Sequence, residues 1–110
     1  MSAEFEIEGQ RFMGLNGGPN FKFNEAVSFF ISVETQDEVD YYWNALTANG
    51  GAEGQCGWLK DKFGVSWQVI PKTLGRLLGD PDRERAQRVV QAMLKMHKIV
   101  IADLEKAAVS

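Results

Sequence analysis

The chain contains few of the residues that metal, redox and nucleophilic sites most often use. Its 110 residues include one cysteine, Cys56, and one histidine, His97. A single cysteine cannot form a disulfide within the chain, and this fits a reducing compartment, so we expect a cytoplasmic protein. A single histidine excludes a histidine-rich metal site within one copy of the chain.

An excess of positive charge and a long apolar run are also missing. There are 12 Lys and Arg residues against 15 Asp and Glu residues, which gives a net charge of −3. Nucleic-acid binding relies on clustered Lys and Arg, so we expect no nucleic-acid partner. No uncharged run approaches the roughly 20 apolar residues of a membrane-spanning helix, and no signal peptide is visible in the first residues. We therefore expect no membrane partner.

What the chain does contain is an ordinary globular composition, with 45% hydrophobic and 25% charged residues. A length of 110 residues is typical of one domain, since domains run to about 100–200 residues. We interpret residues 1–110 as a single domain with three parts. These are a hairpin in 3–20, a β-α-β-β unit in 26–71 and C-terminal helices in 80–108.

Alternating apolar and polar residues predict strands in the first third of the chain. Phe5 and Ile7 alternate with glutamates, and Gly9-Gln10 marks a turn, which indicates a β-hairpin over residues 3–16. A further strand is predicted over 26–33, with one apolar and one mixed face. Such a strand usually packs on a helix and lines a cavity or a second sheet.

Helix signals follow that strand. Thr35 and Glu38 have the spacing of a capping box, and apolar residues at helical spacing continue to Leu46. Asn49-Gly50-Gly51 is typical of a helix end, because these residues tolerate positive φ. The sequence therefore predicts one amphipathic helix between the strands.

The second half of the chain predicts two more strands and then helices. Residues 54–60 and 65–70 have the pattern of a hairpin, which Pro71 closes. Asp80-Pro81 predicts the start of a helix, with proline in the first helical position, and a shorter helical tail covers 101–108.

Four stretches, at residues 9–19, 21–29, 55–71 and 82–96, closely resemble one known family. The 55–71 stretch is the specific one, with the sequence Gln-Cys-Gly-Trp-Leu-Lys-Asp-Lys-Phe-Gly-Val-Ser-Trp-Gln-Val-Ile-Pro. The family is the PhnB-like one, often labelled 3-demethylubiquinone-9 3-methyltransferase. It belongs to the glyoxalase/bleomycin resistance/dioxygenase superfamily, also called vicinal oxygen chelate proteins. The resemblance implies an α+β fold with a glyoxalase-type βαβββ sheet and C-terminal helices.

The chain departs from this family in one respect. Members usually have two paired modules, whereas here the opening strand and helix of the first module are absent. A truncated chain, a naturally short variant and a dimer whose partner supplies the missing wall are all compatible with this departure. Because an unpaired strand edge recruits other chains, we expect a homodimer, with exchange of elements between the two copies as one form of it.

The resemblance also implies where a metal would be held. Enzymes of the superfamily bind a divalent metal with His, Glu or Gln side chains, and the corresponding positions here are Ser28, Gln68 and Asn16. These side chains are neutral, whereas carboxylate and imidazole are the usual ligands of such ions. We therefore predict no metal and no other cofactor. The site is interpreted as a polar ligand pocket, with hydrogen bonding inside a cavity as the alternative.

Aromatic residues on the predicted strands are candidates for the wall of that pocket, although plain core positions are the alternative for them. They are Phe30, Trp58, Trp67 and Phe63. The candidate ligand-binding residues are Ser28, Phe30, Trp58, Trp67 and Gln68.

No catalytic residue is predicted. Cys56 is interpreted as a buried, inert thiol and His97 as a surface residue, so whether the chain is an enzyme stays open. The leading hypothesis is a small-molecule-binding protein without an intact metal site. The alternatives are a metal-dependent lyase, isomerase or dioxygenase with Gln68 as a ligand, a methyltransferase as the family name suggests, or a structural partner module. Methyl transfer is disfavoured because a Rossmann-like crevice typically needs a longer chain.

Overall fold

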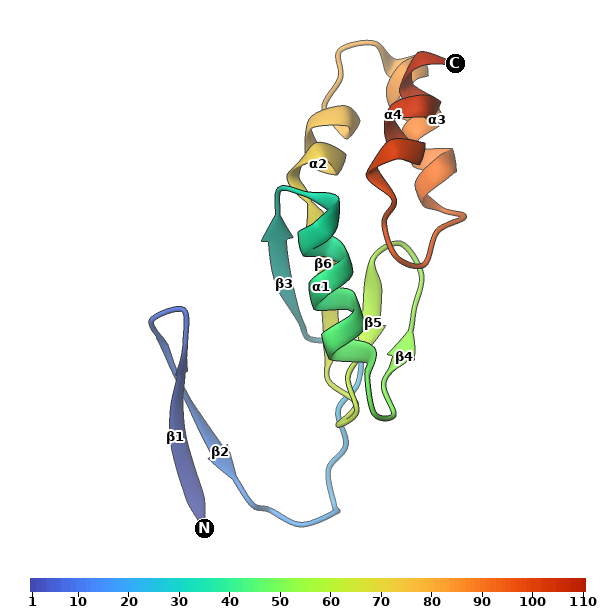
Figure 1. Cartoon of the computed structure of the whole chain (residues 1–110). Helices are drawn as coiled ribbons and strands as arrows, with labels where there is room; N and C mark the ends of the chain where they lie inside the picture. The colour runs from blue at the N-terminus through green and yellow to red at the C-terminus, as the bar shows by residue number, and fades with distance from the viewer.

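The computed structural model describes residues 1–110 and has an elongated shape, with extents of 55 × 26 × 23 Å. Its radius of gyration is 16.4 Å, whereas a compact chain of this length has a value of about 13 Å. The difference arises because a two-stranded hairpin projects from one side of the chain, as Figure 1 shows, with the ring of Phe12 6.0 Å from that of Phe29 in β3. The remaining residues form a four-stranded sheet with one helix beside it and a group of helices beyond its end.

The order of the elements is the one that the resemblance implies. The strands are β1 (Ser2–Ile7), β2 (Gln10–Leu15), β3 (Ser28–Val33), β4 (Ala52–Glu53), β5 (Trp58–Lys60) and β6 (Ser66–Pro71). The helices are α1 (Gln36–Thr47), α2 (Lys72–Leu78), α3 (Arg83–Met93) and α4 (Ile101–Val109). The four-stranded sheet has the order β3-β6-β5-β4, in which β3 is parallel to β6 and the other pairs are antiparallel. From β3 to β6 the chain is thus a βαβββ module, and the predicted α+β fold is confirmed.

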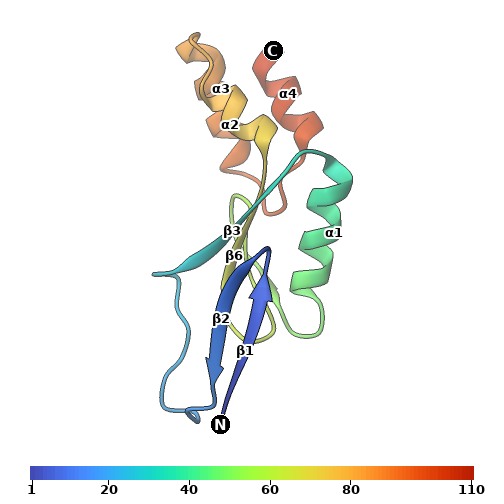
Figure 2. The same ribbon diagram turned by 90° about the vertical axis from the view of Figure 1, so that its left-hand side faces the viewer.

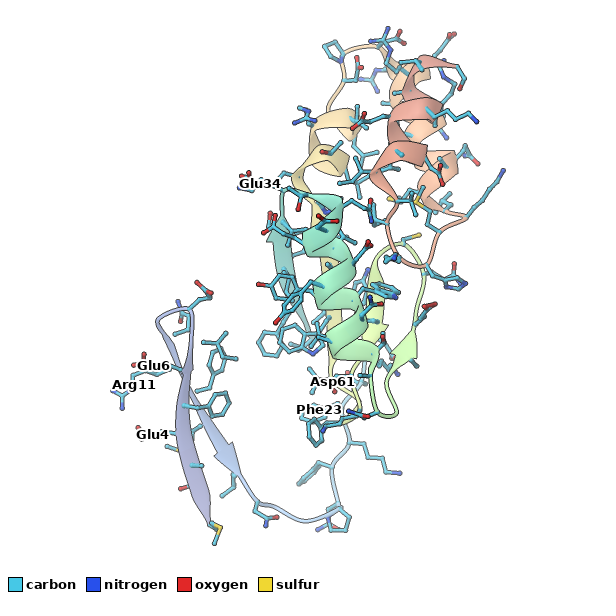
Figure 3. The ribbon with its side chains drawn as sticks, in the orientation of Figure 1. Glu4, Glu6, Arg11, Phe23, Glu34 and Asp61 are labelled. Carbon is cyan, nitrogen blue, oxygen red and sulfur yellow. The ribbon has the colours of Figure 1, made fainter.

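The N-terminal hairpin of β1 and β2 forms as predicted, but its turn lies one residue earlier than Gly9-Gln10. Glu8 and Gly9 form the turn with φ values of 51° and 79°, which are typical of a two-residue type I′ turn. The rings of Phe5 and Phe12 stack at 5.5 Å between centroids. Glu4, Glu6 and Arg11 lie along the opposite side of the hairpin, as Figure 3 shows.

Helix α1 covers one face of the sheet, as Figure 2 shows, and it begins with the predicted capping box. The Thr35 hydroxyl accepts a hydrogen bond from the Glu38 amide at 3.2 Å, and the Glu38 carboxylate accepts one from the Thr35 amide at 3.1 Å. A first core cluster lies between α1 and the sheet. It consists of Val33, Val39, Trp43, Leu59 and Val69.

The strand predicted over 54–60 is confirmed only at Trp58–Lys60, as β5, because residues 54–57 form the turn that follows β4. Cys56 and Gly57 both have positive φ in this turn, at 56° and 86°. A Cβ atom on Gly57 would lie 2.7 Å from Cδ1 of Ile70, so no larger residue fits there without movement. The turn therefore requires glycine for two reasons, its backbone conformation and its close packing.

The C-terminal residues form three helices around a second core cluster. Helix α2 directly follows β6, and no helix was predicted between Pro71 and Asp80. Helix α3 is capped by Asp82, whose carboxylate accepts hydrogen bonds from the Glu84 and Arg85 amides, so Pro81 does not occupy the predicted first helical position. The predicted tail is confirmed as α4. The second cluster consists of Leu74, Val89, Ile99, Leu104 and Ala108. None of the helices has the length and apolar character needed to cross a membrane.

Candidate functional site

The face of the sheet opposite α1, called here the open face, carries two rows of side chains. Successive side chains of a strand point to opposite faces, so the strand register decides which residues share a row. Since Val33, Leu59 and Val69 pack toward α1, the residues next to them in each strand point the other way. One row across β3, β6 and β5 is Ser28, Ser66 and Lys60, and the other is Phe30, Gln68 and Trp58.

The second row joins two aromatic side chains through a carboxamide. The Gln68 Nε2 group donates a hydrogen bond to the Ser28 hydroxyl oxygen at 3.0 Å, which connects the two rows. The carboxamide oxygen of Gln68 has no hydrogen-bond partner within the chain. Phe30 is 60% exposed, and Trp58 is half-buried. The row therefore combines apolar surface with one unpaired acceptor.

The first row ends at an ion pair. Lys60 pairs with Glu25, which lies in the segment between the hairpin and β3. The hydrogen bond from Lys60 is the main cause that holds the pKa of the Glu25 carboxyl below its ordinary value, with the lysine's charge as a further cause. Ser66 is only 1% exposed, and its hydroxyl oxygen has no hydrogen-bond partner. A groove of about 490 Å³ is lined by all three of these residues and by Trp58.

Of the predicted ligand-binding residues, Ser28, Phe30, Trp58 and Gln68 lie on the open face, and Trp67 does not. Trp67 pairs across the strands with Leu59 and therefore lies on the α1 side. Its indole Nε1 group donates to a carboxylate oxygen of Asp61 at 2.9 Å, and its ring lies 5.1 Å from that of Phe29. The register therefore places Trp58 and Trp67 on opposite faces of the sheet, so the two tryptophans do not line one pocket wall as predicted.

Phe63 is not part of the open face either. It lies in the turn between β5 and β6, is 71% exposed, and has the ammonium group of Lys62 5.2 Å from its ring centroid. The residues that the sequence analysis missed are Lys60, Ser66 and Glu25. Strand alternation from Trp58 would have found Lys60, and alternation from Gln68 would have found Ser66, whereas Glu25 depends on the course of the segment before β3.

Two further residues were given no functional role: Cys56 was interpreted as a buried, inert thiol and His97 as a surface residue. Cys56 is half-buried, not buried as predicted, and it lines the same groove as Lys60. His97 is exposed as predicted, and its Nδ1 atom lies 2.7 Å from the carbonyl oxygen of Gly54. This contact ties the turn between β4 and β5 to the segment that precedes α4.

The residues at the superfamily's metal positions do not fit a divalent cation. Ser28 and Gln68 are hydrogen-bonded to each other, and both side chains are neutral. Asn16 directly follows β2 in a hairpin whose strands pair only with each other. Such ions prefer carboxylate and imidazole ligands, and no three His, Cys, Asp or Glu side chains form a group that could hold a metal. We derive no chemistry through a metal at this site.

The βαβββ order, with α1 on one face of the sheet, defines a fold of the glyoxalase type. The family described as 3-demethylubiquinone-9 3-methyltransferase matches residues 1–70, and the chain therefore belongs to this PhnB-like family. No curated protein matches the chain.

Two solved structures are similar to the chain. One is a PhnB protein from Bacillus cereus, named after the same methyltransferase, with 34% identity and a TM-score of 0.58 over 64% of each chain. The other is protein PA1353 from Pseudomonas aeruginosa, which shows the fold alone, with 23% identity and a TM-score of 0.51 over 64% of this chain and 62% of that one. The chain thus spans slightly less than two thirds of the length of these relatives.

Proposed function

We propose that this chain binds a small molecule with an aromatic or apolar body on the open face, without a metal. The observation that carries the proposal is the row of Phe30, Gln68 and Trp58 across three neighbouring strands. Ligand pockets are mostly apolar, with a few polar groups that fix the orientation of the ligand. This row has that composition, and it points away from the first core cluster.

Each residue of the row has a distinct role in the proposal. Phe30 and Trp58 contact the faces of the ligand, since aromatic side chains supply large contact areas. Gln68 donates to Ser28 and therefore presents its carboxamide oxygen to a hydrogen-bond donor on the ligand. The hydrogen bond also fixes the orientation of the carboxamide.

The alternatives receive less support. The lyase, isomerase and dioxygenase hypotheses need ligands for a metal, and the neutral pair of Ser28 and Gln68 does not supply them. Methyl transfer is suggested by the family name and by the name of the Bacillus cereus relative. The sheet here is mixed and carries α1 on one face, unlike the doubly wound sheets that build nucleotide crevices.

We further propose that a second copy of the chain completes the binding site. Strand β3 is at an edge of the sheet, and the segment before it exposes large apolar side chains. Phe21, Phe23 and Val27 are 91%, 65% and 70% exposed. Unpaired strand edges and exposed apolar patches are both typical of interfaces, and a second copy would cover both features at once.

The binding proposal is tested with the three indole N–H signals in a nuclear magnetic resonance titration. The probe is a ubiquinone headgroup without its isoprenoid tail. Its quinone ring has the size of an aromatic ring, and the headgroup dissolves in water without the tail. Binding on the open face shifts the Trp58 signal and leaves that of the buried Trp43 unchanged. Trp67 serves as a second internal control because it lies on the α1 side. A probe that shifts all three signals equally, or none, contradicts the proposal.

The dimer proposal is tested by native mass spectrometry of the full chain. We expect a dimer, and a shift to monomer when Phe21 and Phe23 are both replaced by serine. Val109→Ser is the matched control, because Val109 is 84% exposed at the opposite end of the chain. A monomeric wild-type chain overturns this proposal and leaves the titration to decide the binding proposal.

A further inference from the structure

The ion pair between Glu25 and Lys60 holds an irregular segment against the binding face. Residues 16–27 contain no helix or strand. Of the ion pairs in the chain, the one between Glu25 and Lys60 is the pair that joins this segment to the sheet. The side chains of Lys60 and Glu25 are 43% and 62% exposed. An ion pair this exposed contributes little to stability, so a competing acid can replace the Glu25 carboxylate without disrupting the fold.

Next to this ion pair lies a hydroxyl group that the fold leaves unused. Ser66 faces Lys60 directly across β5 and β6, and its side chain points to the open face. Its oxygen is the one buried side-chain polar atom without a hydrogen-bond partner. Buried hydroxyl groups are normally hydrogen-bonded, so this oxygen is free to take a ligand atom in the groove as its partner.

The remaining polar side chains of the groove have partners other than the Lys60 ammonium group. The Glu53 carboxylate accepts a hydrogen bond from the Trp43 indole at 3.2 Å. The Gln55 side chain lies 3.5 Å from the His97 ring and carries no charge. Displacing Glu25 therefore exposes one positive charge and one hydroxyl donor beside the Trp58 indole.

We propose that the groove takes an organic acid, with its acidic group between Lys60 and Ser66 and its apolar body against Trp58. In the free protein the Glu25 carboxylate occupies the place of the acidic group, and it leaves when the ligand enters. This inference rests on the proposed function and adds to it the chemical class of the ligand. It also assigns Glu25 as an internal competitor that lowers the affinity of the site.

The test compares two probes, naphthoate and naphthamide, which share a ring system. Naphthoate carries a carboxylate, and naphthamide carries a neutral carboxamide in its place. Calorimetry measures the affinity of each probe for the full chain. The nuclear magnetic resonance signal of the Trp58 indole shows whether the probe binds at the groove. We expect naphthoate to bind more tightly than naphthamide. Lys60→Gln should weaken naphthoate about tenfold, since charge-assisted hydrogen bonds are the strong ones, and should leave naphthamide within about twofold.

The internal competitor has a signature of its own. Glu25→Gln should tighten naphthoate several-fold and leave naphthamide unchanged, because only the acid competes with the carboxylate. Lys62→Gln is the matched control, since Lys62 lies in the neighbouring turn and does not line the groove. The dispersion of the indole signals confirms that each variant is folded.

The outcomes separate this inference from the proposed function. If both probes shift Trp58 equally and neither responds to Lys60→Gln or Glu25→Gln, the acid inference is overturned and the binding proposal stands. If the naphthalene probes and the ubiquinone headgroup all leave Trp58 unshifted, the binding proposal fails as well. If Glu25→Gln weakens naphthoate, Glu25 is a ligand-binding residue and not a competitor.

Discussion

Gln68 on β6 donates a hydrogen bond to Ser28 on β3 at 3.0 Å. The two strands are parallel neighbours in the sheet, although β6 begins 38 residues after β3 in the chain. The bond lies on the face that α1 leaves uncovered, and it fixes the carboxamide between Phe30 and Trp58. The central feature of the candidate site is therefore a glutamine that lies between two aromatic side chains and is bonded to a serine of the neighbouring row. The contribution of this hydrogen bond to stability can be measured without a ligand.

Gln68→Met retains the length of the side chain and removes the hydrogen bond to Ser28. We expect the free energy of unfolding to fall by about 1 kcal/mol, the usual net value of such a bond. Urea denaturation measures the change, and Gln91→Met on the exposed surface of α3 is the control. Equal effects of the two substitutions would show that the bond to Ser28 does not stabilise the sheet.

Ser66→Ala should have opposite effects on stability and on binding. Since the buried hydroxyl has no partner, its removal should raise the free energy of unfolding by about 1 kcal/mol. The same substitution should weaken naphthoate and leave naphthamide unaffected. Ser32→Ala, at an exposed position of β3, should change neither quantity. A loss of stability on Ser66→Ala would mean that the hydroxyl is hydrogen-bonded in solution.

Gly57→Ala should destabilise the chain strongly. Its φ is +86°, and the added Cβ would lie 2.7 Å from Ile70 Cδ1 and 3.1 Å from Ile99 Cγ1. Backbone strain and overpacking together predict a loss of roughly 2–4 kcal/mol in the free energy of unfolding. The matched control is Gly75→Ala in α2, where no atom lies within 4 Å. There we expect a gain of about 0.5–1 kcal/mol, because alanine favours the helix more than glycine does.

The capping box of α1 predicts a pH dependence of stability. Hydrogen bonds from the backbone amides of Glu34 and Thr35 hold the pKa of the Glu38 carboxyl below its ordinary value of 4.5. A folded-state pKa below the unfolded one contributes stability that is present above the unfolded value and is lost as the pH falls through the folded one.

Glu38→Gln should therefore lower stability at neutral pH and have a smaller effect in acid. The measurement is the urea midpoint of wild type and variant across the acidic range. The control is Glu105→Gln, because Glu105 is exposed on α4 and forms no ion pair. A difference between wild type and Glu38→Gln that does not change with pH would contradict this account.

Local patterns were sufficient to predict most of the elements. The capping box at Thr35 and Glu38 and the α4 tail were located correctly, because their signals lie within a few neighbouring residues. The turn at Cys56 and Gly57 was missed, since positive φ at a cysteine has no local sequence signal. The turn is held by contacts from elsewhere in the chain, since the Cys56 amide donates to the Met96 carbonyl oxygen and Gly57 packs against Ile70.

The candidate site was predicted in part. Ser28, Phe30, Trp58 and Gln68 were found by resemblance and alternation, and they share one face as strand geometry requires. Trp67 was assigned to the same wall, but the β5–β6 register pairs it with Leu59 on the α1 side. A shift of one residue moves a side chain to the opposite face, and single-strand patterns do not contain the register.

The sequence by itself determined the family, the α+β class and the neutral character of the residues at the metal positions. These properties depend on which residues are present and on their spacing along the chain. Only the tertiary structure decided that Lys60 lies beside Ser66, and that Glu25 reaches Lys60 from a segment outside the sheet. Both contacts join residues from separate segments, so they exist only when the register of the sheet and the course of the chain before β3 bring those segments together.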